Sequence, residues 1–363
     1  MIRAAVFDGP GKPFRFETFP RPTLGPGEVL VRVTLCTVCG SDLHTVGGRR
    51  TGPTPCVLGH EAVGMVEGVG DGACDVAGVP LRVGDRVVWA VAAICGRCFF
   101  CTHRLPQKCE SLRKYGHDRL TQTSGPHGGY ATHCHLFAGS TVVRVPGGLP
   151  DAVAAPAACA TATVMAAYRE ALNHSTGDRF PRCVVIFGLG MLGLTACAVA
   201  SVGEASVVVG ADIDAARLVL AARFGATHPV RLPTDGVGLL AQVKELTAGR
   251  GADLALELSG SPIAAGLSLE VLRIGGTAIW LGAVLPTGPV PVNPEQIVRK
   301  CLTLKGVHNY APPDLDSAIT FLASHHRRFP FADLVAQSFP LSEIDIAFRN
   351  AAADRPVRVG LIP

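Results

Sequence analysis

A thiol, an imidazole and a carboxyl group, all of which bind zinc in proteins, lie in two short segments of the chain. Cys39 begins the segment 39–44, Cys-Gly-Ser-Asp-Leu-His, while His60 and Glu61 end the segment 59–61, Gly-His-Glu. Taken singly, a Cys is more often a packed core residue than a ligand. A catalytic zinc ion takes three protein ligands and keeps one position open for water or substrate. Cys39 and His60 supply two ligands, so a third has to come from another part of the chain.

A second group of cysteines is more closely spaced. Cys95, Cys98, Cys101 and Cys109 form the pattern Cys-x2-Cys-x2-Cys-x7-Cys. Four sulfur ligands close a tetrahedral zinc shell, which indicates a structural metal rather than a catalytic one. An iron–sulfur cluster is the rival hypothesis, but the bacterial ferredoxin pattern has its fourth Cys after three residues and then a Pro. A nucleic-acid zinc ribbon would pair two Cys-x2-Cys knuckles across a longer gap.

The segment 188–193, Gly-Leu-Gly-Met-Leu-Gly, follows an apolar run and precedes a longer one. Glycines at this spacing allow a tight turn, the approach of a pyrophosphate and close packing of a helix on a strand. The free amides at the start of that helix bind the phosphates. An acidic residue about twenty positions further on binds the ribose hydroxyls. The predicted cofactor-binding residues are Gly188, Leu189, Gly190, Met191, Leu192, Gly193, Asp212 and Arg217.

The acidic residue also bears on which dinucleotide is bound. Asp212 is followed by Ile213, so the 2′-phosphate of NADP would meet a like charge without an adjacent arginine to receive it. The sequence therefore favours NAD. Arg217 lies a short way further on and keeps NADP open as an alternative.

The elements that must position these groups differ between two parts of the chain. Residues 1 to about 150 hold short β-branched runs between Gly and Pro residues, which predicts a partly open β-barrel. Residues 151–168 are rich in Ala and predict a helix that contains Cys159 and Thr163. From residue 182 onward, short apolar strands alternate with helical stretches, the pattern of a doubly wound parallel sheet. The predicted fold class is therefore α/β, with a barrel domain and a nucleotide-binding domain.

Composition limits the classes of partner. The chain has 363 residues, 48% hydrophobic and 17% charged, enough for two globular domains. A net charge of +4 without any basic run argues against nucleic acid. Thirteen cysteines, four of them tightly grouped, fit reduced thiols in the cytoplasm better than a secreted disulfide framework. The uncharged run 183–203 could imitate a membrane span, but its spaced glycines predict strand, turn and helix, so we expect no membrane association.

The two ligand segments, the four-cysteine pattern and the glycine-rich segment together resemble the zinc-dependent medium-chain alcohol dehydrogenases over nearly the whole chain. The resemblance implies a GroES-like catalytic domain at 1–155 with a structural-zinc lobe at 95–109. It further implies a Rossmann NAD-binding domain at 156–300 and a return to the catalytic domain at 301–363.

The same resemblance implies the cofactors and partners. Cys159 stands where the family has its third catalytic zinc ligand, which gives two zinc ions per chain in addition to NAD. The expected substrate is a small alcohol or aldehyde, and the expected assembly is a homodimer or homotetramer.

Further roles follow from the resemblance alone. In similar dehydrogenases a hydroxyl, the cofactor ribose and a histidine pass the alcohol proton to solvent, and here the two side chains are Ser41 and His44. Turn capping with a surface imidazole is the alternative for this pair. Asp42 and Glu61 are expected behind the ligands, and Glu61 also as an occasional replacement for water on the metal. Thr163 is expected at the nicotinamide.

Arg49 and Arg50 lie in a loop that contributes to the substrate pocket in this family. A guanidinium matches carboxylate, phosphate or phosphonate, so the pair predicts an anionic substrate, and solvated charges on a loop are the alternative. His117 is expected in the same pocket.

The chain is also similar to a narrower group, the alcohol dehydrogenases associated with phosphonate catabolism, in four short segments. That likeness implies a hydroxyalkyl phosphonate or its aldehyde as substrate. The segments are 48–50, 115–117, 307–310 and 328–331.

A competing hypothesis is a non-catalytic relative that binds a dinucleotide and acts as a redox sensor or structural protein. The joint presence of Cys39, His60 and Cys159 counts against it, because a binding module has no need of an open metal site. Two zinc ions per chain would support the enzyme, and one would support the alternatives.

Overall fold

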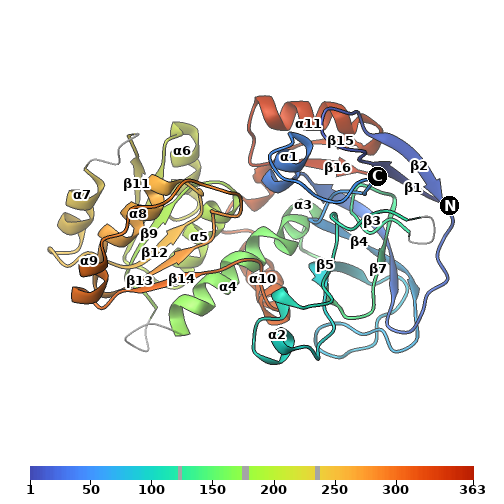
Figure 1. Ribbon diagram of the computed structural model, residues 1–363, viewed down its shortest axis with the longest axis horizontal. Coiled ribbons are helices and arrows are strands. Elements are labelled where there is room, and N and C mark those ends of the chain that lie inside the picture. The colour runs from blue at the N-terminus through green and yellow to red at the C-terminus, as the bar shows by residue number, and fades with distance from the viewer. Residues whose placement is uncertain (122–124, 174–179, 234–237) are drawn as a thin grey trace. The chain divides into compact units, whose positions relative to one another are not determined.

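The structure is a computed structural model that describes residues 1–121, 125–173, 180–233 and 238–363 (Figure 1). The chain forms two units, one made of Met1–Ala162 with Asn309–Pro363 and the other of Thr163–His308. Both termini belong to the first unit, because the second unit is inserted into it. Each unit has its own core of buried apolar side chains.

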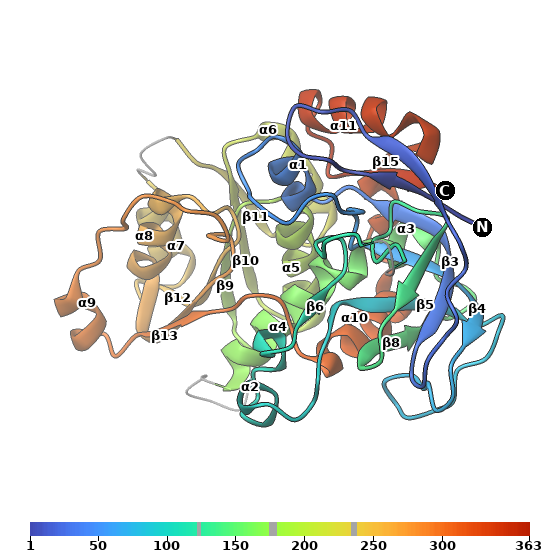
Figure 2. The same cartoon turned by 45° about the vertical axis from the view of Figure 1, so that its right-hand side comes forward.

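The first unit is built on an eight-stranded sheet with the order β15-β16-β3-β4-β5-β6, to which β7 adds at β3 and β8 at β5 (Figure 2). β3 is antiparallel to three strands, β4, β7 and β16, so the sheet curls into the predicted partly open barrel. The C-terminal strand thus completes the sheet begun near the N-terminus. The strands of this unit are β1 (Ile2–Val6), β2 (Arg15–Phe19), β3 (Val29–Thr37), β4 (Ala62–Val69), β5 (Arg86–Ala93), β6 (Arg113–Lys114), β7 (His133–Leu136), β8 (Ser140–Arg144), β15 (Val335–Pro340) and β16 (Arg358–Ile362).

Short helices connect these strands, and two longer ones pack with the C-terminal strands and the barrel. Helix α1 starts directly after Cys39, where the Asp42 carboxylate accepts a hydrogen bond of 3.1 Å from the Cys39 backbone N–H. The segment 39–44 therefore places the potential ligand Cys39 directly before a helix, where Asp42 holds its backbone N–H. The helices are α1 (Gly40–Val46), α2 (Phe99–Thr102), η1 (Pro106–Lys108), α3 (Asp151–Ala154), η2 (Ala155–Ala158), α10 (Pro312–His325), η3 (Phe331–Leu334), η4 (Leu341–Glu343) and α11 (Ile344–Ala353).

The second unit contains a six-stranded parallel sheet with the order β11-β10-β9-β12-β13-β14. The order changes direction between β9 and β12, the switch point at which doubly wound sheets bind their ligands. All five residues of β9 are buried, as expected for a central parallel strand. The elements are α4 (Ala160–Asn173), β9 (Cys183–Phe187), α5 (Met191–Val202), β10 (Val207–Asp212), α6 (Ala215–Arg223), β11 (His228–Arg231), α7 (Leu239–Leu246), β12 (Ala252–Glu257), α8 (Pro262–Glu270), β13 (Leu272–Trp280), α9 (Pro294–Arg299) and β14 (Thr303–Gly306).

The boundaries of the units differ somewhat from the boundaries at 155 and 300 expected from the sequence. The first unit extends to Ala162, because η2 packs against strands of the barrel. The second unit extends to His308, because β14 pairs with β13 as the last strand of the parallel sheet. Among the helices of the described residues, none has the length and apolarity needed to cross a membrane.

Candidate active site

The first unit brings together four potential metal ligands from three segments. One ligand atom each from Cys39, His60, Glu61 and Cys159 lies within 4.8 Å of the others. Cys39 precedes α1, the pair at 60–61 precedes β4, and Cys159 lies between η2 and α4. Sulfur, imidazole nitrogen and carboxylate oxygen are the donors that zinc takes. The donor set therefore fits a zinc ion, as the sequence predicted.

The imidazole of His60 is oriented by a buried carboxylate. His60 Nδ1 lies 3.5 Å from Asp42 Oδ1, and Asp42 also accepts a hydrogen bond of 3.0 Å from the Tyr130 hydroxyl. Burial alone would lower the pKa of His60, but the charges of Asp42 and Cys39 raise it to about 10. A carboxylate on one ring nitrogen leaves the other nitrogen free to bind a metal. The site is thus rich in negative charge and suited to a cation.

The two thiols are in direct contact. A hydrogen bond between them lowers the pKa of Cys39 well below its usual range and raises that of Cys159. One thiolate is therefore favoured in the site even without a metal. Zinc binds thiolates, so both protons leave when the ion is bound.

Glu61 is held by a group that the sequence analysis did not identify. Arg358 on β16 donates two hydrogen bonds to its carboxylate, from Nε to Oε2 at 2.7 Å and from Nη2 to Oε1 at 2.8 Å. The Thr37 hydroxyl donates a third, at 2.6 Å. Arg358 Nη2 also lies 3.8 Å from Cys39 Sγ. Burial raises the pKa of Glu61 to about 7 although the guanidinium acts in the opposite direction. These contacts anchor Glu61 behind the ligands.

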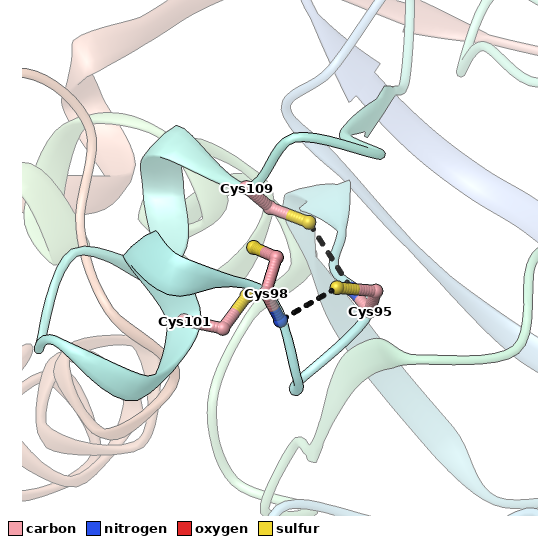
Figure 3. A group of neighbouring side chains, drawn as sticks. All are labelled: Cys95, Cys98, Cys101 and Cys109. Carbon is pink, nitrogen blue, oxygen red and sulfur yellow. Dashed lines mark hydrogen bonds between the residues drawn. The ribbon is translucent and has the colours of Figure 1, made fainter.

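The four cysteines of the segment 95–109 form a separate cluster (Figure 3). Their sulfur atoms lie within 4.8 Å of one another. The Cys95 N–H points to Cys109 Sγ at 3.3 Å and the Cys98 N–H to Cys95 Sγ at 3.4 Å. Backbone N–H groups of Glu110 and Cys101 lower the pKa of Cys98 to about 6. Such N–H···S contacts favour thiolates, so the cluster fits a four-sulfur zinc site.

The residues predicted for proton transfer lie in α1. The Ser41 hydroxyl is 3.3 Å from His60 Nε2, a ring nitrogen of a potential ligand. In the described part of the chain, no hydrogen bond joins Ser41 to His44. Burial, with Arg49 as a second cause, lowers the pKa of His44, so its imidazole is neutral at pH 7. A direct link between these two side chains is therefore absent from the part of the chain that the structure describes.

A cavity of about 140 Å³ lies within the first unit, and one of the residues that line it, His117, is a neighbour of His60. Arg50 and His117 line it, together with Thr45 and Leu58. Arg50 Nη1 lies 3.4 Å from His117 Nε2, and the His117 ring centroid lies 5.4 Å from that of His60. Arg50 therefore contacts His117, and the His117 ring lies next to the ring of the potential ligand His60.

The two adjacent arginines have different environments. Arg49 is exposed and does not line the cavity, whereas Arg50 is half-buried in its wall. Lys114 on β6 adds a positive charge that the sequence analysis did not identify. Burial lowers the pKa of Lys114, and the charge of Arg50 lowers it further. Among the described residues, no carboxylate forms an ion pair with Arg50 or Lys114.

The glycine-rich loop lies between β9 and α5 in the second unit. Gly188 has φ +87°, and a Cβ on Gly193 would lie 1.9 Å from the Gly188 carbonyl oxygen. A Cβ on Gly190 would meet nothing within 4 Å, so this position leaves room for a ligand. Asp212 ends β10 and accepts a hydrogen bond of 2.6 Å from the Leu189 N–H. The three glycines thus have the three roles that a dinucleotide-binding loop requires. Thr163 lies in α4, and Arg217 in α6.

Comparisons with known proteins agree with this geometry. Residues 25–147 match the family model of the alcohol dehydrogenase GroES-like domain, and residues 192–324 match that of the zinc-binding dehydrogenases. The chain is 33% identical over 345 residues to 5-exo-hydroxycamphor dehydrogenase from Pseudomonas putida, covering 93% of each chain. It is 30% identical over 355 residues to sorbitol dehydrogenase from Halalkalibacterium halodurans, covering 96% of each.

Two solved structures share the whole fold. An alcohol dehydrogenase from Thermotoga maritima has a TM-score of 0.90 and 28% identity, with 100% of this chain and 99% of that chain covered. A zinc-binding dehydrogenase from Sinorhizobium meliloti, bound to NADP, has a TM-score of 0.84 and 25% identity, with 100% and 99% covered.

Proposed function

Because the chain belongs to the zinc-dependent medium-chain alcohol dehydrogenase family, we propose that it transfers a hydride between an alcohol and NAD(H) at the site formed by Cys39, His60 and Cys159. The alcohol carbon gives its hydride to the nicotinamide, the hydroxyl proton passes to solvent, and an aldehyde or ketone remains. The observation that carries the proposal is the buried donor set of two thiols and an imidazole beside an anchored carboxylate.

The proposed ligands of the catalytic zinc are Cys39, His60 and Cys159. When bound, the zinc supplies Lewis acidity, which lowers the pKa of a hydroxyl on it and polarises a carbonyl. The Asp42 carboxylate keeps His60 oriented with one ring nitrogen toward the ligand cluster. Arg358 contacts the Glu61 carboxylate and the Cys39 sulfur, so its guanidinium fixes the positions of these two groups beside the proposed zinc.

The proposed route for the proton begins at Ser41, whose hydroxyl lies beside His60 and would accept the alcohol proton while releasing its own proton toward His44. Neutral His44 can take that proton, because burial lowers its pKa. Its position in the last turn of α1 places it between the ligand Cys39 and the loop with Arg49.

The proposed substrate carries an anionic group, with a hydroxyalkyl phosphonate or its aldehyde as the leading candidate. The cavity beside His60 supports this, since Arg50 and the nearby Lys114 have no carboxylate partner among the described residues. Burial, followed by the charges of His60, Lys114 and Arg50, lowers the pKa of His117 to about 2, so this wall offers a neutral imidazole as well. A guanidinium next to an imidazole can bind the oxygens of a phosphonate from two sides.

The proposed cofactor is NAD, bound by the loop at 188–193. The Asp212 carboxylate is tied to this loop through Leu189, so a 2′-phosphate would approach a fixed negative charge. One relative of similar fold binds NADP, which makes NADP the alternative to test. In this proposal Thr163 contacts the nicotinamide, and Arg217 lies near the adenosine end.

The proposed structural site uses Cys95, Cys98, Cys101 and Cys109, which gives two zinc ions per chain. All thirteen cysteines are free thiols, which fits a reducing compartment, and we place the protein in the cytoplasm. An assembly of two or four copies is proposed from the family, and light scattering on the purified protein tests it.

A panel of alcohols with NAD or NADP, followed by the absorbance of the reduced nicotinamide, tests the proposal. We expect turnover with NAD and faster turnover for anionic alcohols than for neutral ones. The dinucleotide-binding sensor without catalysis is the alternative, and it would bind NADH while oxidising no alcohol and reducing no aldehyde in the panel.

A further inference from the structure

A buried tyrosine hydroxyl joins two segments beside the proposed ligand Cys159. Tyr310 is only 5% exposed. Its hydroxyl accepts a hydrogen bond of 3.2 Å from the Val91 N–H on β5 and donates one to the Ala158 carbonyl at the end of η2. The hydroxyl therefore fixes η2 relative to the barrel sheet. All three residues belong to the first unit.

The Ala158 carbonyl lies in the peptide bond to Cys159. Cys159 has φ −121° and ψ −63°, a conformation outside the helical region, and separates η2 from α4. The Cys159 N–H closes the last turn of η2 with a hydrogen bond of 3.2 Å to the Pro156 carbonyl, and the change of backbone conformation at Cys159 separates this turn from α4. A bond to the preceding carbonyl restrains the plane of that peptide and with it the positions of the Cys159 N and Cα atoms, from which the side chain extends.

Tyr310 is itself well anchored. It follows Asn309, which has φ +56°, at the point where the chain returns to the first unit. The next residue, Ala311, donates its N–H to Asp314 Oδ2 at 2.8 Å as α10 begins. A tyrosine at the start of a capped helix of fourteen residues is a rigid support.

We propose that Tyr310 is a positioning residue for the catalytic zinc, acting through the Ala158 carbonyl on the ligand Cys159. Cys39 and His60 are oriented by Asp42, and Tyr310 serves the third ligand in the same way. This inference rests on the proposed role of Cys159 as a ligand. Groups that orient metal ligands in this manner typically change metal affinity by about 10- to 100-fold when removed.

The test compares Tyr310→Phe with Tyr168→Phe in the zinc-loaded full chain. Tyr310→Phe removes one oxygen atom and keeps the ring in the core. Tyr168 is a matched control, because its buried hydroxyl donates a hydrogen bond of 2.8 Å to the Ala196 carbonyl, and both residues belong to the second unit whereas both metal clusters belong to the first. Zinc release into EDTA is followed with a zinc-sensitive dye, and the zinc that remains is counted by mass spectrometry. A cobalt-loaded sample reports thiolate coordination through its charge-transfer absorption.

We expect Tyr310→Phe to release one of its two zinc ions about 10- to 100-fold faster than wild type. The second ion should leave at the wild-type rate, and the cobalt–thiolate band should change. Tyr168→Phe should match wild type in all three readouts. Wild-type release rates and an unchanged cobalt band in Tyr310→Phe would overturn the inference while leaving the proposed function intact. A wild-type chain that binds a single zinc would overturn the proposed function and this inference together.

Discussion

Replacing Arg50 with Ala should selectively weaken turnover of anionic alcohols. Its guanidinium lines the cavity 3.4 Å from the His117 imidazole and has no carboxylate partner among the described residues. Two unit charges about 4 Å apart interact by about 4 kcal/mol at an effective dielectric constant of 20, which is an upper limit for a half-buried side chain. A hydrogen bond to a charged group contributes about 1.5–3 kcal/mol. We therefore expect kcat/KM for an anionic alcohol to fall by about 10- to 100-fold.

The chain offers a matched control in the neighbouring residue. Arg49→Ala removes the same charge from an exposed position outside the cavity, so it should change kcat/KM by less than about threefold, the range of a surface charge. Arg50→Lys keeps the charge but not the planar fork and should fall between the two.

The assay follows NADH absorbance with a hydroxyalkyl phosphonate and its neutral dimethyl ester. The expected result is a loss for the phosphonate alone in Arg50→Ala. Equal losses for both substrates, or equal losses in Arg49→Ala and Arg50→Ala, would refute the assignment of Arg50 to an anion-binding wall.

Variants in three further parts of the chain, namely Arg358, the loop at 188–193 and His127, test the other assignments. Arg358→Met leaves the Glu61 carboxylate buried without its partner and should lower the free energy of unfolding by about 3–5 kcal/mol in urea titrations, with Glu61→Gln in the same chain restoring most of it. Gly193→Ala would place a Cβ 1.9 Å from a carbonyl oxygen of its own loop and should abolish NADH binding in fluorescence titrations; Gly190→Ala adds a methyl group in open space and should weaken binding without lowering Tm. Burial lowers the pKa of His127 from 6.5 to about 4, so the unfolded chain takes up a proton in this window that the folded chain does not. Stability should therefore fall as the pH drops from 6.5 to 4, by up to about 1.4 kcal/mol per pH unit, and the urea midpoint of His127→Asn should depend less on pH.

The sequence analysis grouped the potential metal ligands in the two sets that the structure brings together, because their chemistry is unusual and partly local. The four cysteines at 95–109 lie within one lobe, so their spacing alone indicates the cluster. Cys39 and His60 lie in short segments of distinct pattern, whereas Cys159 in an Ala-rich stretch carries no local signal. Only the family resemblance identified it, and the structure places it with the others.

The sequence did not reveal Arg358 or Tyr310 as supports of those ligands, because their partners are distant in the chain. Arg358 contacts Glu61 across 297 positions, and Tyr310 contacts Ala158 across 152. A charged residue inside the apolar strand 357–361 was the available signal for Arg358, since a buried arginine needs a partner. No comparable signal marked Tyr310, because a tyrosine beside a helix start is an ordinary core residue.

The sequence also could not separate Arg49 from Arg50, which are adjacent in a loop. Their difference depends on the direction of each side chain, and the structure turns only Arg50 into the cavity wall. The bounds of the two units differ from the domain bounds expected from the sequence for a related reason. A strand such as β14 belongs to the sheet in which it finds a partner, and pairing partners are not visible in the strand itself.

Counting zinc in the wild-type chain and in Cys159→Ser, by mass spectrometry after dialysis, tests the central claim most directly. Convergence of Cys39, His60 and Cys159 on one ion predicts two zinc atoms per wild-type chain and one in the variant, with the sulfur cluster at 95–109 still loaded. Two zinc atoms in both proteins, or a single one in the wild type, would contradict it.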